Sequence, residues 1–232
     1  MSTQITFLNH SGFSVETDSK VLVFDYYKDP SGTVKAYSQI RRKPVWFFVT
    51  HWHDDHFNGR IADFDGDQYI INADVPLKRD GLKAVHAMKL YDTLNVGDAK
   101  ITQYGSTDEG GSFLVETDGL KIFHAGDLNW WHWLGDTDEN NAEAKANFER
   151  EMKHVAGQTF DIVFFPVDAR LEGAREWGVK GFLKDVSVTK CLIPMHYFGT
   201  PWTPSADFKA AYPDVPLWIP KHDGDDLIIP EK

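Results

Sequence analysis

The segment THWHDDHFNG, residues 50–59, places three histidines and two aspartates within the six positions from His51 to His56. Such a dense group of ionisable side chains is costly to fold unless it binds something, because buried charge has to be paired or coordinated to a metal. The apolar run Val45–Val49 comes directly before it and predicts a β-strand. The fold must therefore hold this turn at a strand end, where protein scaffolds commonly place chemistry.

The spacing inside this turn indicates metal binding. His51 and His53 lie two positions apart, so their imidazoles can converge on one cation in a tight turn, and Asp55 and His56 can face a second cation beside it. Imidazole and carboxylate ligands without a nearby thiolate suit Zn²⁺, and also Fe or Mn. The alternative is a solvated polar turn that happens to be rich in histidine.

Further strands are predicted where β-branched and aromatic residues gather in short runs. These runs are Ile5–Leu8, Gln68–Asn72, Lys100–Tyr104, Ile162–Phe165, Cys191–Ile193 and Asp226–Ile229. In addition, the segments 12–25 and 111–127 resemble each other: each reads as a strand, a turn around Thr-Asp, a second strand and then an aspartate. Either this is a chance likeness between two hairpins, or two related β-rich halves each deliver chemistry from a strand end.

A helix is predicted over residues 138–156, because Ala144, Phe148, Met152 and Val155 recur at helical spacing and Gly157 can end it. Shorter helices are predicted at Gly59–Asp63, Gly178–Asp185 and Ser205–Ala211, the last with Ser205 as its N-cap. Strands in two groups, each followed by helices, predict two packed sheets with helices outside. This is an α/β fold, a four-layer αββα sandwich.

Composition limits the classes of protein that this chain can represent. Its 232 residues, 42% of them hydrophobic, are enough for a single layered domain over residues 1–232. The formal charge of −11 argues against long nucleic acids as partners, since that binding uses clustered Lys and Arg. The single cysteine, Cys191, lies in an apolar run and is expected to be buried. Neither a signal peptide nor a membrane-spanning run is evident, so we expect a cytoplasmic protein without membrane contact.

The His-x-His-x-Asp-His pattern of residues 51–56 resembles the signature of the metallo-β-lactamase superfamily, whose members share the αββα sandwich. The resemblance implies two further ligands at later strand ends. The segment KIFHAGD supplies Asp127 in the position of an aspartate that bridges two metals, and CLIPMHYFG supplies His196. Both sequence contexts look most like the branch that contains ascorbate-phosphate lactonase.

One motif of that superfamily is missing. Members of the superfamily have a histidine about twenty residues before the bridging aspartate. In this chain that segment, residues 104–113, reads YGSTDEGGSF and contains no histidine. Ser106, Thr107 and Asp108 stand there instead. The resemblance thus implies a first metal position with His51, His53 and Asp127, and a complete second position with Asp55, His56, Asp127 and His196. Asp108 can replace the absent imidazole directly or through water, or the residues here can leave room for water only. The sequence therefore leaves open whether the site binds one zinc ion or two.

The resemblance also implies a chemistry. A metal-activated water would attack a small, anionic ester, lactone or phosphoester, with the metal stabilising charge on the substrate oxygen. Asp55, where it is not occupied as a ligand, would be catalytic by orienting that water or moving its proton. Three alternatives remain open. One is a phosphodiesterase of small nucleotides, another is a binding or sensor protein that keeps the fold with a degraded site, and the third is a redox protein with iron in place of zinc.

Residues that contact the substrate are predicted around the metal ligands, namely His132, Arg170 and Tyr197. The tryptophans Trp130, Trp131 and Trp133 form either an aromatic wall of the pocket or a packing cluster for the next helix. Arg170 either binds a carboxylate or phosphate of the substrate or forms a surface ion pair with Asp168.

The remaining polar residues are assigned less specific roles. His124 is expected in the core or behind the ligands rather than on the metal. The sequence assigns no role to His10 or His222. A solvated helix face is predicted for Arg175, Lys180 and Lys184.

Overall fold

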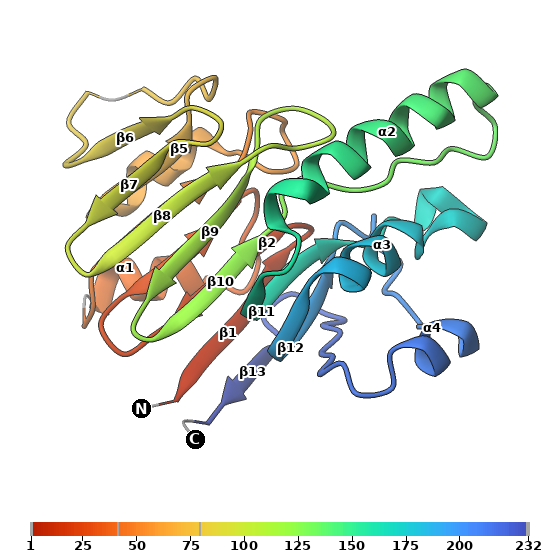
Figure 1. The fold of residues 1–232 in the computed structure, drawn as a ribbon. Helices are drawn as coiled ribbons and strands as arrows, with labels where there is room; N and C mark the ends of the chain where they lie inside the picture. The colour runs from red at the N-terminus through yellow and green to blue at the C-terminus, as the bar shows by residue number, and fades with distance from the viewer. Residues whose placement is uncertain (1, 41, 79, 231–232) are drawn as a thin grey trace.

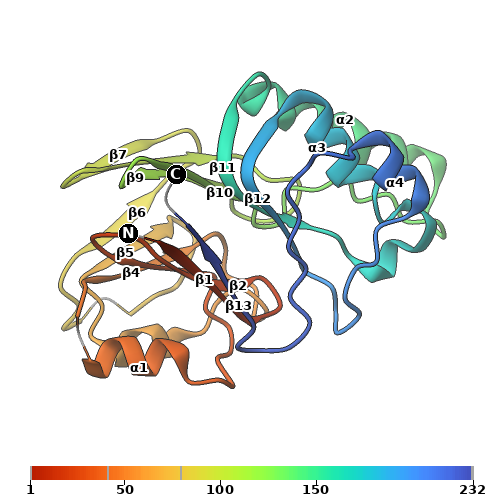
Figure 2. The ribbon, with the colours of Figure 1, turned by 90° about the horizontal axis from the view of Figure 1, so that it is seen from below.

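Two β-sheets lie face to face in the computed structural model, with helices on both outer faces (Figure 1). The structure describes residues 2–40, 42–78 and 80–230. Figure 2 shows the layers edge-on: α1 covers one sheet, while α2, α3 and α4 lie on the side of the other. The predicted αββα sandwich is confirmed.

The first sheet combines antiparallel and parallel strands. Its order is β13 (Asp226–Ile229), β1 (Thr3–Asn9), β2 (Gly12–Glu16), β3 (Val21–Phe24), β4 (Val45–Val49), β5 (Gln68–Asn72) and β6 (Val85–Met88). The strands from β3 to β6 pair in parallel, and the others pair antiparallel. Parallel neighbours place their carboxyl ends at one edge of the sheet.

The second sheet repeats this arrangement. Its order is β12 (Ser187–Met195), β11 (Thr159–Pro166), β10 (Leu120–His124), β9 (Ser112–Thr117), β8 (Ala99–Tyr104) and β7 (Thr93–Val96). Strands β10, β11 and β12 are parallel, whereas β7 to β10 form an antiparallel meander.

The helices are α1 (Thr33–Ile40), α2 (Asp138–Val155), α3 (Trp177–Asp185) and α4 (Ala206–Ala211), with short 3₁₀ turns η1 (Gly59–Phe64) and η2 (Ala169–Ala174). No helix in the described residues is long and apolar enough to cross a membrane.

Strand β4 shows why the layers form. Its sequence VWFFV is apolar at every position, so both of its faces must be covered. Trp46 and Phe48 point into the core shared by the two sheets. Val45, Phe47 and Val49 point the other way, into a second cluster that includes residues of α1 and η1. The turn that follows β4 is thereby fixed between the two sheets.

Several sequence predictions are confirmed residue by residue. Strands β4, β5 and β13 have the predicted bounds, and α2 ends one residue before the predicted end. The Ser205 side chain accepts a hydrogen bond from the Phe208 N–H, as an N-cap does. Cys191 is buried, as expected.

One helix and two strands were not predicted, namely α1, β6 and β7, and neither was the 3₁₀ turn η2. Helix α1 has only eight residues, too few to repeat an apolar face over several turns, and the Asp29 carboxylate accepts hydrogen bonds from the Thr33 and Val34 N–H groups at its first turn. Strands β6 and β7 have four residues each, so any alternation of polar and apolar residues is too short to stand out in the sequence.

The two similar segments form equivalent hairpins, β2–β3 and β9–β10. Their turns also touch, because the Asp118 carboxylate accepts hydrogen bonds from the Ser19 N–H at 3.2 Å and the Ser19 hydroxyl at 2.9 Å. At the opposite end of both hairpins the chain continues to Asp25 and Asp127, at the edge where the candidate site lies.

Candidate metal centre

The six predicted ligands come together where the parallel strands of both sheets end. His51, His53, Asp55 and His56 follow β4 in the first sheet. Asp127 follows β10 and His196 follows β12 in the second sheet. The folded chain thus brings together side chains that are up to 145 residues apart in sequence.

Asp127 lies at the centre of this group. Its Oδ1 lies 3.0 Å from the His56 Nε2 and 3.5 Å from the His196 Nε2, while its Oδ2 lies 3.4 Å from the His51 Nε2. An aspartate with imidazoles on both carboxylate oxygens has the arrangement expected of a residue that bridges two cations.

The ligand atoms fall into overlapping sets that could each hold an ion. In one set, potential ligand atoms of His53, Asp108 and Asp127 lie within 4.8 Å of one another, and in another those of His51, His53 and Asp55 do so. Asp55, His56 and His196 belong to a further set. The carboxylate of Asp108 therefore lies beside two of the residues expected at the first metal position.

The unsatisfied polar atoms fit this interpretation. The Nε2 atoms of His51 and His56 and the Oδ1 of Asp127 are buried, and although they lie close to one another, no hydrogen bond of acceptable geometry satisfies them among the described residues. Buried polar atoms without partners are rare and costly in native proteins. Nitrogen and oxygen donors that converge in this way are what a zinc, iron or manganese ion requires.

Asp25 orients two of the imidazoles from behind. Its Oδ2 lies 2.8 Å from the His56 Nδ1, and it accepts hydrogen bonds from the Thr50 N–H at 2.8 Å and the Thr50 hydroxyl at 2.7 Å. Because a carboxylate can only accept, the His56 Nδ1 carries the hydrogen and its Nε2 faces the centre. Since the Thr50 hydroxyl hydrogen points to Asp25, Thr50 Oγ1 accepts from the His51 Nδ1, 3.0 Å away.

Asp168 has the same function for His196. Its Oδ2 lies 3.0 Å from the His196 Nδ1, and Arg170 donates to both carboxylate oxygens at 2.7–3.1 Å. The Asp168 side chain is fully buried. The ion pair between Asp168 and Arg170 that the sequence offered as an alternative is therefore formed, but its carboxylate is buried behind His196 and only its guanidinium reaches the surface. Metal-ligating histidines usually have such a carboxylate behind them, which fixes the tautomer.

The charges in the cluster shift the pKa values of its members. Burial alone lowers the pKa of His56, but Asp127 and Asp25 outweigh it and raise this pKa well above the ordinary value. Burial raises the pKa of Asp127, but His56 and His196 hold it well below its usual range. Similarly, the pKa of Asp55 is lowered against the effect of burial by the imidazoles of His10 and His56. The shifts of the two aspartates favour ionised carboxylates at the centre, and the raised pKa of His56 is the response of its imidazole to these negative charges.

The loop between β8 and β9, which lacks the family histidine, supports the site by close packing. Thr107 donates to the Asn129 carbonyl at 2.6 Å and accepts from the Asn129 N–H at 2.9 Å, which holds the segment after Asp127. Gly110 has a φ of +64°, and a Cβ there would lie 2.5 Å from the His51 Cβ. Only glycine allows the loop to pack this closely against the Thr50 carbonyl and the His51 Cβ.

A cavity of about 380 Å³ opens onto the candidate ligands. Its lining includes Trp131, Trp133, Arg170 and Phe198 together with His53, Asp55, Thr107, Asp108, Asp127 and His196. Of the three tryptophans, Trp131 and Trp133 thus form an aromatic wall. Trp130 instead packs against Phe148 of α2, with ring centroids 6.4 Å apart.

Two of the three predicted substrate contacts lie elsewhere. His132 packs on the Trp177 ring, with centroids 4.4 Å apart, and does not line this cavity. Tyr197 is buried, and its hydroxyl donates to the Pro220 carbonyl at 3.1 Å. Arg170 does line the cavity, and its guanidinium carbon lies 3.7 Å from the Phe198 ring centroid.

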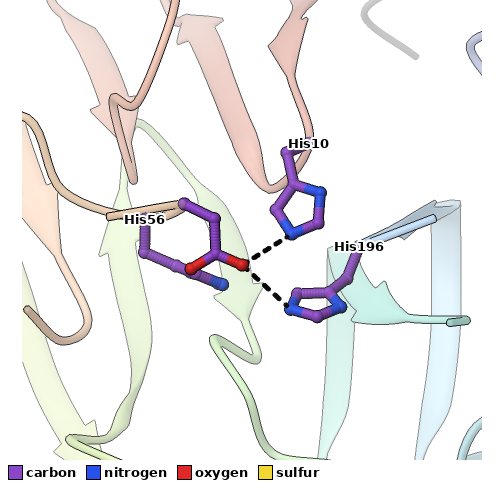
Figure 3. A group of neighbouring side chains, drawn as sticks. His10, His56 and His196 are labelled. Atoms are coloured by element: carbon purple, nitrogen blue, oxygen red, sulfur yellow. Dashed lines mark ion pairs between the residues drawn. The ribbon is translucent and has the colours of Figure 1, made fainter. Parts of the chain in front are cut away.

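Sequence reasoning gave no role to His10, and it did not identify Asp25 as the residue behind two ligands. His10 reaches the centre from the turn between β1 and β2, with Nε2 3.3 Å from the Asp55 Oδ2 (Figure 3). For Asp25 a signal existed, since it ends the hairpin that resembles the one before Asp127.

His124 is buried behind the site, its Nε2 2.9 Å from the Ser11 carbonyl. His222 is exposed.

Comparison with known proteins places this geometry in a family. A family model described as the beta-lactamase superfamily domain matches residues 4–196. A protein of Natranaerobius thermophilus named UPF0173 metal-dependent hydrolase is 25% identical over 218 residues, which covers 88% of this chain and 87% of that protein. A protein of the same family name from Pyrococcus furiosus is 25% identical over 219 residues, with 88% and 87% covered.

Among solved structures, Igni18, a metallo hydrolase of Ignicoccus hospitalis, has the same fold, with a TM-score of 0.66 over 100% of both chains at 16% identity. The family model spans the segments that supply all six predicted ligands, which the two sheets bring to one edge. This chain therefore belongs to the metallo-β-lactamase superfamily of hydrolases.

Proposed function

We propose that this protein hydrolyses a small, anionic ester, lactone or phosphoester with a metal-activated water. The observation that carries the proposal is the composition of one cavity, which is lined both by candidate metal ligands and by the Arg170 guanidinium and aromatic rings. Its volume of about 380 Å³ is at the small end of the range for ligand pockets, about 300–1,000 Å³.

Arg170 supports an anionic substrate. Its Nε and Nη2 bind Asp168, and stacking on Phe198 restricts the guanidinium plane. A guanidinium fixed in this way keeps Nη1 available to a carboxylate or phosphate that enters the cavity. Trp131 and Trp133, whose rings are stacked 6.1 Å apart, offer apolar surface to the rest of a small substrate.

The residues of the chain would divide the work as follows. His51, His53, Asp108 and Asp127 would hold the first ion, and Asp55, His56, Asp127 and His196 the second. When bound, the ion supplies an acidic water and positive charge for the substrate oxygen. Asp55 is about one-third exposed and lines the cavity, so where it is not occupied as a ligand it can orient that water and move its proton. Asp25 and Asp168 keep the imidazoles in the required tautomer.

We propose zinc as the ion, because the donors are imidazoles and carboxylates in a compact group without thiolate. Iron and manganese accept the same donors. Elemental analysis by mass spectrometry, on protein purified without added metal, identifies the ion. Iron or manganese at one equivalent or more, with zinc absent, would contradict the assignment of zinc.

A substrate panel tests the reaction. Paired lactones and esters, each with and without a phosphate or carboxylate group, are compared with bis-p-nitrophenyl phosphate. We expect the charged member of a pair to have the higher kcat/KM. A preference for the neutral members would exclude an anionic substrate, and turnover of the phosphodiester alone would favour the phosphodiesterase alternative. Inactivity on the whole panel would count against the hydrolase proposal.

Variants of the central ligands test the site. We expect Asp127→Ala and His196→Ala to lose bound metal and at least about 10³-fold in kcat/KM, since catalysis by a metal site requires its ligands. The exposed Asp74→Ala serves as the matched control. Full metal content and full turnover in both ligand variants would show that the site is assigned wrongly.

A further inference from the structure

His10 is the one imidazole close to the metal centre that neither the sequence pattern nor the family motif assigns. It lies in the turn between β1 and β2, in the left-handed backbone region with a φ of +53°. The His10 carbonyl accepts a hydrogen bond from the His196 N–H at 3.2 Å, which ties this turn to the end of β12. The two rings lie side by side, with centroids 4.3 Å apart.

The ring of His10 points into the cluster (Figure 3). Its side chain is only 8% exposed, and its Nε2 lies 3.3 Å from the Asp55 Oδ2. That nitrogen is buried, and no hydrogen bond of acceptable geometry satisfies it within the described chain. A histidine that only fills the core is normally paired, as His124 is with the Ser11 carbonyl.

The surrounding distances are those of ligands around a shared ion. Potential ligand atoms of His10, Asp55, His56 and His196 all lie within 4.8 Å of one another. The Asp55 Oδ2 is 3.3 Å from the His10 Nε2 and 3.8 Å from the His196 Nε2. Two donors that each bind an ion at about 2.0–2.2 Å are roughly 3.3–4.2 Å apart, depending on the angle between them.

We propose that His10 is a ligand of the second metal position, together with Asp55, His56 and His196. This inference rests on the metal site used in the proposed function, but not on any substrate. Asp127 would be a further ligand of the same ion. Protein side chains would then supply all of its ligands, as they do in structural metal sites that leave no position open for water. The first position, with a carboxylate from the exposed Asp108, keeps room for water and substrate. The second ion is thus held more tightly than the first.

Metal binding without substrate tests this assignment. Purified protein is stripped with a chelator and then titrated with Zn²⁺ in competition with a coloured chelator, and with Co²⁺ while its visible spectrum is recorded. We expect His10→Ala to weaken the tighter of the two binding steps by more than about 100-fold, which exceeds the effect of losing an outer partner of a ligand. We also expect the Co²⁺ spectrum of that step to change, because the number of ligands falls.

Two variants accompany His10→Ala. His10→Gln keeps a polar side chain of similar size, so it separates loss of the imidazole from a local collapse of the turn. His222→Ala removes an exposed imidazole elsewhere and should leave both binding steps unchanged. Circular dichroism of the stripped proteins checks that each variant is folded.

Two results would overturn the assignment. One is wild-type affinity with a wild-type Co²⁺ spectrum in both His10 variants. The other is a loss of only about 10- to 100-fold with an unchanged spectrum, which would place His10 outside the ligand shell as a positioning partner of Asp55. Since no substrate is used, inactivity on the substrate panel leaves this test intact.

Discussion

Individual residues at the metal centre adopt backbone conformations that most side chains avoid. His10, Asp25, His196 and Phe198 have φ angles between +43° and +61°. Aspartate and histidine tolerate this region better than most residues, whereas phenylalanine rarely adopts it. Such strain persists only where surrounding contacts impose it, and it gathers at functional sites. Here the local conformation turns the side chains after β1, β3 and β12 toward one another.

Asp25 allows a prediction at this scale. Replacing it with asparagine keeps the size of the side chain but removes the charge that holds His56 and Thr50. We expect Asp25→Asn to bind metal about 10- to 100-fold more weakly although every ligand is present. Chelator competition measures this, with the exposed Asp74→Asn as the control. Unchanged affinity would mean that Asp25 has only a packing role.

At the scale of elements, Glu176 connects helices α3 and α4. Its carboxylate accepts hydrogen bonds from the Trp202 Nε1 at 3.0 Å, the Ser205 N–H at 2.7 Å and the Ser205 hydroxyl at 2.6 Å. Arg175 reinforces this region by donating to the Val167 and Thr200 carbonyls. The prediction of a purely solvated face is therefore wrong for Arg175. These contacts fix the chain that follows His196.

Glu176 predicts a pH-dependent contribution to stability. Burial raises the pKa of Glu176, but the hydrogen bonds from Ser205 and the Lys180 ammonium lower it below the ordinary value of 4.5. A carboxyl with a lowered folded-state pKa stabilises the fold above its unfolded pKa, and this contribution disappears as pH falls through the folded pKa. We expect Glu176→Gln to reduce the free energy of unfolding by about 1–2 kcal/mol at pH 7, and by progressively less below about pH 4.5.

Urea unfolding of wild type and Glu176→Gln at several pH values from 7 down to about 3, which spans the loss expected below the unfolded pKa, measures this difference. Glu149→Gln, on the exposed face of α2, is the control, because its partner Lys145 is also exposed. A difference that stays constant over the whole pH range would show that the charge of Glu176 does not contribute.

At the scale of the whole molecule, the metal centre joins the two sheets. The turn after β4 belongs to one sheet, whereas Asp127 and His196 belong to the other. Phe13 and Phe24 of the first sheet also contact Phe164 of the second, with ring centroids 4.5 Å and 6.0 Å apart. An ion bound at this edge would therefore add a connection between layers that otherwise meet mainly through apolar packing.

Metal removal should for this reason lower the thermal stability of the whole fold. At a free metal concentration 100 times the Kd, binding contributes about 2.7 kcal/mol, and for a chain of this size each kcal/mol shifts the Tm by about 2–4 °C. We expect a chelator to lower the Tm by about 5–11 °C. Scanning calorimetry measures the shift, and Asp127→Ala should show almost none. Equal Tm values for wild type with and without chelator would contradict a metal that links the sheets.

The residues around His51 show which features of the fold and the site can be predicted from local sequence patterns. Strand β4 is apolar on both faces, so its place between two layers and the exit of His51–His56 from its end follow from the sequence alone. The family motif then identified Asp127 and His196, because both come directly after apolar strands. Helix α2 was predicted from the spacing of its apolar residues, and Ser205 was predicted as an N-cap from its side-chain chemistry.

What only the tertiary structure decided is which distant side chains meet. His10 lies 186 positions before His196 in the sequence, and no periodicity relates the two. They meet because the turn between β1 and β2 hydrogen bonds to the end of β12 across the two sheets. Likewise, the carboxylates of Asp25 and Asp168 stand behind imidazoles because parallel strands align their carboxyl ends. Strand order and sheet packing are long-range properties, so the sequence determined the chemistry at each strand end and the folded chain determined how those ends combine.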